Sequence, residues 1–342
     1  MNGKDIRDSA REERVRAITS FELTERQARF LVHVLVHAGV FVPRQYCAFA
    51  GIAHGQKSHD FVAKLVARRY AKLIETGSPH RGRLFHVHYK PLYEAIGEPD
   101  NRHRKPVSIG RMIERLMMLD GVLADRRRYS WLGTERDKVA YFTQCLNIPH
   151  HDLPQVTFQS EDGERETTRY FPDKLPIGCE RDGGIRQVFL YLVTRDVPVD
   201  FRMFLLRHAE LLRSLTEWTI RVLIPRRFRK AFAVYRYALR DELAMPLQLS
   251  TVTELEWFFR ERLRRARHPS QPPDPRFDEA CRTFDAARFQ VLYRMWYQQG
   301  DAALSAAASW TLQEALACGE GRLEFVELSH QYLHLSSLVG VA

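Results

Sequence analysis

Charged side chains at helical spacing mark the segment from Gln56 to Arg69 as the part of the chain with the clearest binding chemistry. Lys57, Lys64 and Arg68 recur on one side of a helical projection, and the opposite side is apolar: Phe61, Val62, Leu65 and Val66. Residues three and four apart share a face of a helix, so the pattern predicts an amphipathic helix with a cationic outer surface. Lysine and arginine suit phosphates or guanine edges, and glutamine suits adenine. The indicated chemistry is contact with a polyanion.

The distribution of charge supports this interpretation. The net charge of the 342-residue chain is +10. Residues 1–133 contain 24 Lys and Arg against 14 Asp and Glu, whereas residues 134–342 contain 28 of each, so the whole excess lies in the first part. A localised basic excess indicates a polyanion-binding module. No apolar run reaches the roughly 20 residues of a membrane span, and the N-terminus is charged, so a cytoplasmic protein is expected, nucleoid-associated when bound to DNA.

The elements around this segment follow local signals. Residues 1–21 are predicted to form a charged, solvated arm or a frayed helix. Thr24 to Gln27 is a capping box that begins a one-faced helix ending at Gly39. A second helix runs from Pro43 to Gly51, and Ser58 is expected to cap the third. Two strand-like runs follow, 71–76 and 83–89, joined by a glycine-flanked turn.

Three helices followed by a hairpin, with a basic third helix and a basic hairpin tip, resemble the winged-helix family over residues 22–97. The resemblance implies that the third helix enters the major groove of double-stranded DNA while the hairpin touches the backbone or the minor groove. The helix residues it implies as contacts are Gln56, Lys57, His59, Lys64 and Arg68, with Arg69 at the edge, and the hairpin contacts are Arg81 and Arg83. The alternative is a small helical domain whose basic face docks on another protein.

Residues 98–133 are expected to form a polar linker, an amphipathic helix from Val107 to Leu119 and a hairpin from Val122 to Trp131. The hairpin would carry further candidate DNA contacts, Arg126, Arg127 and Arg128. This segment is interpreted as a second, abbreviated winged element or as a dimerisation helix, and a homodimer is expected. His86 and His88 are expected to be surface histidines of a strand, because no nearby ligands complete a metal site.

Residues 134–245 read as helix, three strands, helix and strand, the three strands being 155–159, 167–171 and 187–194. This order resembles the PD-(D/E)xK nuclease-like core, and a winged helix before it is similar to the replication-relaxation group of mobile-element proteins. The resemblance places Pro172 and Asp173 at the metal-binding aspartate of the family. The acid and lysine required on the next strand are absent, because Val188 to Val193 is wholly apolar. We therefore expect a degenerate core used for scaffolding, with no catalytic residues, metal or cofactor.

Residues 246–342 are predicted to be a helical interaction region for a possible protein partner, with aromatic stripes that are typical of a core and a last strand-like run, Arg322–Leu335. The sequence thus predicts an α+β protein with an N-terminal winged helix-turn-helix, a central nuclease-like core and a helical C-terminal region. The expected function is a sequence-selective regulator, or a replication or mobilisation factor, of a plasmid, other mobile element or defence locus. The alternatives are a metal-dependent nuclease using Asp173 and a protein-interaction adaptor with secondary DNA contact.

Overall fold

The computed structural model describes residues 3–74, 83–159, 166–181, 183–268, 272, 274–330, 332 and 335. Helices and one mixed five-stranded sheet make up most of this part of the chain, so the predicted α+β class is confirmed. Among the described residues, no helix is both long and apolar enough to cross a membrane.

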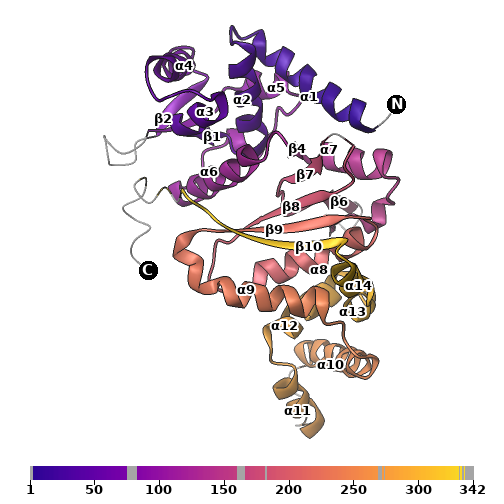
Figure 1. Cartoon of the computed structure of the whole chain (residues 1–342). Helices are drawn as coiled ribbons and strands as arrows, with labels where there is room; N and C mark the ends of the chain where they lie inside the picture. Colours follow the sequence, from indigo (N-terminus) through magenta and orange to yellow (C-terminus); the bar gives the residue numbers. More distant parts are fainter. Residues whose placement is uncertain are drawn as a thin grey trace.

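The N-terminal part is a set of helices around a small antiparallel sheet (Figure 1). Its elements are α1 (Gly3–Thr19), α2 (Glu25–His37), β1 (Val40–Phe41), α3 (Pro43–Ala50), α4 (Gln56–Ala67), β2 (Ala71–Ile74), β3 (Leu84–Val87) and α5 (Lys90–Ala95). The strand order is β1-β3-β2, so the two-residue strand after the first predicted helix pairs with the second strand of the hairpin. The predicted capping box is present, since Thr24 and Gln27 bond each other's backbone through their side chains.

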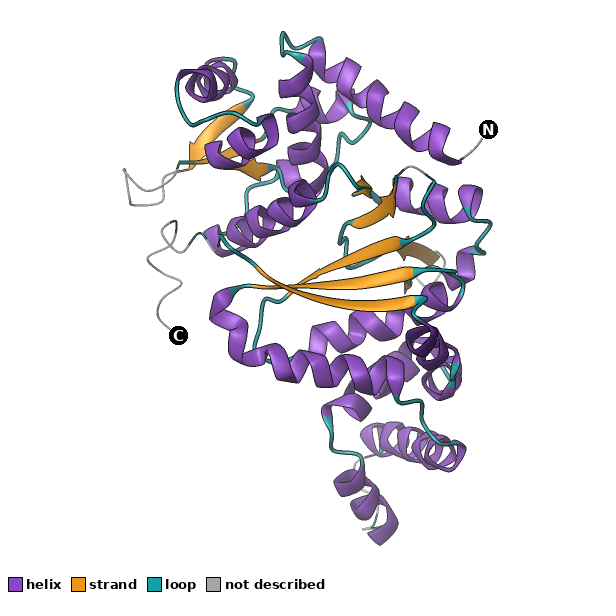
Figure 2. Cartoon of the chain, in the orientation of Figure 1, coloured by secondary structure: helices purple, strands orange, loops and turns teal. Residues whose placement is uncertain are grey.

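The central sheet has the order β10-β9-β8-β7-β4 (Figure 2). Its strands are β4 (Tyr129–Leu132), β7 (Ile177–Glu180), β8 (Gln187–Leu192), β9 (Trp218–Ile224) and β10 (Gly321–Glu327). β4, β7 and β8 are antiparallel neighbours, and β8, β9 and β10 run parallel. Helix α8 (Val199–Arg213) makes the crossover between β8 and β9.

Helices cover both faces of this sheet, and the side chains of β8 show why. Val188, Leu190 and Leu192 point to one core, together with α6 (Ile109–Ala124) and the N-terminal helices. Phe189 and Tyr191 point to the other core, together with α8 and α9 (Phe232–Leu239). Successive residues of a strand face opposite sides, so a strand buried on both faces must be apolar throughout. The apolar run of β8 is therefore what its position in the sheet requires.

The remaining elements lie around the central sheet and the helices that cover it. Helix α7 (Glu135–Ala140) continues into a π turn (Tyr141–Cys145), and β5 (Gln155–Gln159) pairs only with β6 (Glu166–Tyr170). Short 3-10 and π segments lie at Arg102–Arg104, His150–Asp152, Arg226–Ala231 and Arg240–Ala244. Helices α10 (Leu249–Arg267), α11 (Pro275–Thr283), α12 (Ala287–Gln299) and α13 (Ala302–Ala308) form a third core against α8, and α14 (Thr311–Cys318) leads back to β10.

Several sequence expectations need correction. The predicted hairpin 122–131 is wrong: α6 continues to Ala124, and Tyr129–Leu132 is a single strand that pairs with β7. The three core strands are β4, β7 and β8, since β5 and β6 form a separate two-stranded sheet. In the region 246–342, β10 overlaps the expected strand-like run 322–335 and adds a strand to the central sheet.

Two solvated segments in the sequence interpretation are in fact packed. The first helix, α1, buries Val15 and Ile18 against α2 instead of forming a solvated arm. His86 is 1% exposed, and its Nε2 lies 2.9 Å from the backbone oxygen of His103, so it is not a surface histidine. The predicted segments 22–97 and 98–133 share one continuous hydrophobic core, which also takes in one face of the central sheet.

Candidate nucleic-acid interface

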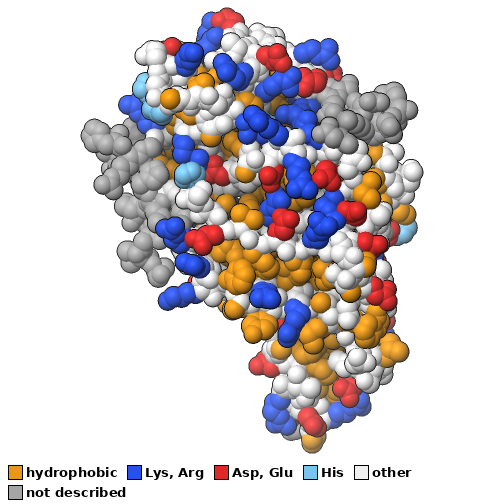
Figure 3. Space-filling model, viewed as in Figure 1, with side chains coloured by type: hydrophobic (Ala, Val, Ile, Leu, Met, Phe, Trp, Pro, Cys, Tyr) orange, Lys and Arg blue, Asp and Glu red, His pale blue; other side chains and the backbone are white. Residues whose placement is uncertain are grey.

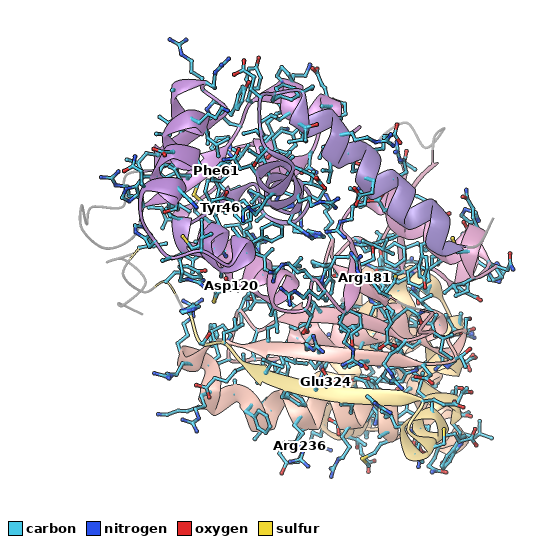
Figure 4. All side chains as sticks on the ribbon, turned by 45° about the horizontal axis from the view of Figure 1, so that its top comes forward. Tyr46, Phe61, Asp120, Arg181, Arg236 and Glu324 are labelled. Carbon is cyan, nitrogen blue, oxygen red and sulfur yellow. The ribbon has the colours of Figure 1, made fainter. Side chains whose placement is uncertain are left out.

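Helix α4 is fixed by its buried side. Gly55 is the N-cap residue, and the hydroxyl of Ser58 donates to the Gly55 oxygen at 2.8 Å, so Ser58 acts from inside the first turn and is not itself the cap. Phe61 and Leu65 are fully buried, and the ring of Phe61 lies 4.2 Å from that of Tyr46 on α3 (Figure 4). Aromatic packing of this kind sets the rotation of the helix. The residues predicted for the outer face are therefore turned to solvent.

The outer face of α4 is polar and shallow. Gln56, Lys57 and His59 are all exposed, and small residues continue the surface at Ala63 and Ala67. Histidine and basic side chains appear at the end of the molecule that α4 forms (Figure 3). The side-chain amide of Gln56 donates to Asp60 at 2.6 Å. This surface offers hydrogen-bond donors to another molecule.

The C-terminal turn of α4 contacts an acid that the sequence interpretation did not include. Glu22 lies in the loop after α1, where it forms an ion pair with Arg68, and its backbone oxygen accepts from the amine of Lys64. Both predicted DNA contacts therefore already hold a partner within the chain. Arg69 is exposed and has a positive φ of 57° just after the helix.

Of the two arginines predicted as hairpin contacts with DNA, Arg83 lies within the described residues. Arg83 is exposed and immediately precedes β3, which pairs with β2. Arg81 lies outside the described residues. Lys72 on β2 is also exposed and adds a cation that sequence reasoning did not select.

The arginines after α6 serve different ends. Arg126 donates to the backbone oxygens of Leu123 and Phe49, both at 3.0 Å, and its guanidinium lies over the Phe49 ring. It ties α6 to α3, so it is a structural contact, not an outward-facing one. Arg128 forms an ion pair with Glu180 of β7, and Arg127 is exposed. Of the three predicted contacts, Arg127 is the most available.

The candidate for chemistry, Asp173, lies in a different part of the molecule. One of its carboxylate oxygens accepts from Arg207 of α8 at 2.9 Å, and the other is buried without a hydrogen-bond partner. His208, next along α8, is buried among aromatic rings, and burial lowers its pKa to about 4.

Lys138 of α7 belongs to the same buried group and was not predicted. It is 1% exposed, with its amine 5.4 Å from the centroid of the Phe171 ring. Burial, followed by Arg102, lowers its pKa to about 7, and Asp173 opposes the shift. Desolvation disfavours the charged form of a lysine, which explains the direction.

This group has charges of both signs but no metal-binding arrangement. Glu135 accepts a hydrogen bond from the Tyr170 backbone nitrogen at 2.8 Å. Within the described part of the chain, no group of three or more His, Cys, Asp or Glu side chains is placed to hold a metal ion. Magnesium in nucleases is held by carboxylates together with substrate phosphates. Arg207 occupies the one carboxylate that the family resemblance points to.

No protein-family model, curated protein or solved structure matches this chain, so its site is interpreted from geometry and charge.

Proposed function

We propose that this protein binds double-stranded DNA by placing α4 in the major groove, with the β2–β3 hairpin against the backbone. The observation that carries the proposal is the exposed face of α4, where Gln56, Lys57 and His59 stand on a helix held by a fully buried opposite side. A major groove about 12 Å wide admits one helix, and lysine and glutamine contact phosphates and adenine respectively.

The connectivity of the N-terminal elements supports the winged-helix resemblance. A short strand separates α2 from α3, and this strand pairs with the second hairpin strand to give the order β1-β3-β2. The small sheet thereby fixes the base of the hairpin beside α4. The proposed contact of the helix and the hairpin with the same DNA depends on this position.

The central sheet supports the second resemblance through different strands from those expected. α6, β4, β7, β8, α8 and β9 give the order helix, three strands, helix, strand, with β9 parallel to β8. We propose that this core is a degenerate nuclease-like scaffold and that the protein acts as a regulator or mobilisation factor of a mobile element in the cytoplasm, as a homodimer. The paired Asp173 and the apolar β8 support the absence of catalysis.

The test is a salt titration of DNA binding by the full chain, using fluorescence anisotropy with a labelled duplex. Each phosphate contact contributes about 0.9 to the slope of log affinity against log salt. Lys57→Ala together with Lys64→Ala should lower that slope by roughly two and weaken binding at least about tenfold.

A charge-matched control is available on α9. Arg236 and Arg240 are exposed on the side of the molecule away from α4, as the positions of Arg236 and Phe61 show (Figure 4). Arg236→Ala with Arg240→Ala should leave the affinity and the slope unchanged. Binding that does not depend on salt, or that falls equally in both double variants, would reject α4 as the interface.

A further inference from the structure

A cavity of about 220 Å³ lies where the N-terminal helices meet the edge of the central sheet. Its walls come from α1, α2, β4, α7 and the π turn that follows α7. The apolar part of the lining is made by Val32, Val36, Trp131, Leu132 and Ala140. None of these residues belongs to the α4 surface, so the cavity is separate from the proposed DNA contact.

The volume limits what the cavity can hold. An apolar cavity of about 150 Å³ in another protein holds benzene, so about 220 Å³ admits one six-membered ring with a small substituent. A dinucleotide or a larger cofactor is too big. The branched side chains of Val32 and Val36 on one side and the indole of Trp131 on another suit a flat apolar ring.

Two polar groups of the lining are buried without a partner. The indole Nε1 of Trp131 and the Nδ1 of His37 have no hydrogen-bond partner, and His37 is only 6% exposed. The indole is fixed in place, because it lies over Gly178, its cross-strand neighbour on β7, where an added Cβ would come within 2.8 Å of the ring. Buried polar groups are nearly always hydrogen-bonded, so these two nitrogens are exceptions beside the cavity.

The charges around the cavity favour an anion. Three guanidinium groups line it, those of Arg11, Arg14 and Arg136, against the single carboxylate of Asp137. Arg14 donates to both oxygens of Asp137 at 2.8 Å, so this pair is internally neutral and holds α1 in place. Arg11 lies 3.3 Å from Nε2 of His33 across the cavity wall.

Nearby cations add to the effect of burial on the two histidines of α2. Burial lowers the pKa of His37 to about 3, with Lys138 as the next cause, while Asp137 opposes the shift. Burial followed by Arg11 lowers the pKa of His33 well below its usual range. The second cause in each case is a neighbouring cation, Lys138 or Arg11, and a cation at this place also attracts a negative charge.

We propose that this cavity binds a monocyclic aromatic carboxylate, with the ring between Val32, Val36 and Trp131 and the carboxylate toward Arg11. This assignment does not depend on DNA binding.

The probe is benzoate, titrated calorimetrically into the full chain, with benzyl alcohol as the neutral molecule of the same size. We expect saturable one-to-one binding of benzoate with a Kd below about 1 mM and at least tenfold weaker binding of benzyl alcohol. Arg11→Met should weaken benzoate about tenfold. Arg16→Met removes an exposed arginine from the same helix, away from the lining, and should change nothing.

Filling the cavity gives the decisive variants. Ala140→Leu fills it from α7, and Ala10→Leu fills it from α1, where Ala10 is exposed enough for the larger side chain to leave the fold intact. Circular dichroism of each variant is measured first, and Ala10→Leu provides the result if Ala140→Leu does not fold. Absence of saturable binding, equal affinity for the two probes, or benzoate binding that survives cavity filling would overturn the proposal.

Discussion

The α4 surface and the Asp173 group use the same residue types under opposite conditions. On α4, Lys57 and His59 are exposed and contact solvent. Around Asp173, Lys138 is fully buried and Arg207 is mostly buried, and the charges face one another inside the protein. A cation in water attracts a polyanion at little cost, whereas a buried cation has already lost its hydration and depends on internal partners.

Exposure to solvent therefore distinguishes a binding residue from a structural residue better than residue type does. Asp173 has the residue type and sequence position that the nuclease resemblance demands, yet Arg207 holds it at 2.9 Å. Lys57 has no special motif, yet its position on an exposed face makes it available. The comparison predicts that substitutions in the buried group change stability, and that substitutions on α4 change DNA affinity.

The largest effect is expected from the pH dependence of Lys138. Its pKa of about 7 lies below that of an unfolded lysine, about 10.4, so the unfolded chain binds more protons between these values. The free energy of unfolding should therefore rise with pH across that window, by on the order of 4 kcal/mol. Lys138→Met removes the titrating group. Urea unfolding at pH 7 and at pH 10 should therefore show the rise in the free energy of unfolding for the wild type and not for the variant.

Lys57→Met is the matched control for this measurement. It makes the same chemical change on the exposed face of α4, where substitutions usually alter stability by less than about 0.5 kcal/mol. A stability–pH curve that stays the same in Lys138→Met would mean that the buried lysine does not lose its proton, and the contrast between the two regions would fail.

Asp173→Ala should cost about 3 kcal/mol of stability, since removing one partner of a buried ion pair leaves the other charge uncompensated. The side chains of Asp173 and Arg207 are 24% and 13% exposed, so solvent screening of the pair is limited. Denaturant unfolding measures the loss, and Asp60→Ala on α4 should change stability by no more than about 0.5 kcal/mol. Mg²⁺-dependent DNA cleavage that disappears in Asp173→Ala would instead make this aspartate catalytic.

Local signals predicted most of the elements that these experiments use. Thr24 and Gln27 form the expected capping box, and the strand expected at 187–194 is β8, Gln187–Leu192, because caps and apolar runs act within a few residues. The stripe on α4 was also predicted in its essentials: Phe61 and Leu65 are buried, although Val66 is 41% exposed. Backbone preferences and periodicity determine such features before the chain meets itself.

The features that the sequence did not predict depend on contacts between segments far apart in the chain. β7 is four residues long and includes Gly178, so it has no strand signal of its own, and it forms because β4 and β8 flank it. β10 pairs with β9 although nearly a hundred residues separate the two strands in the sequence. Lys138 sits in a polar run, Glu135 to Lys138, which looks solvated until the neighbouring elements close over it.

The smallest effect, and the finest test of the α4 surface, concerns Glu22. Its carboxylate pairs with Arg68 across 46 residues, so it competes with any phosphate for that guanidinium. Glu22→Gln should strengthen DNA binding about threefold to fivefold and steepen the salt dependence by about one contact, because one more cation becomes available. The lost pair is exposed and should cost less than about 1 kcal/mol of stability.

Glu25→Gln provides the matched control, since Glu25 is equally acidic, exposed, and paired with Arg29 on α2 instead of with α4. The same change in net charge then acts at a site that does not touch the α4 surface. If both variants strengthen binding equally in anisotropy titrations, the effect is a long-range response to net charge. A gain confined to Glu22→Gln would identify Arg68 as a DNA contact that the protein itself holds partly occupied.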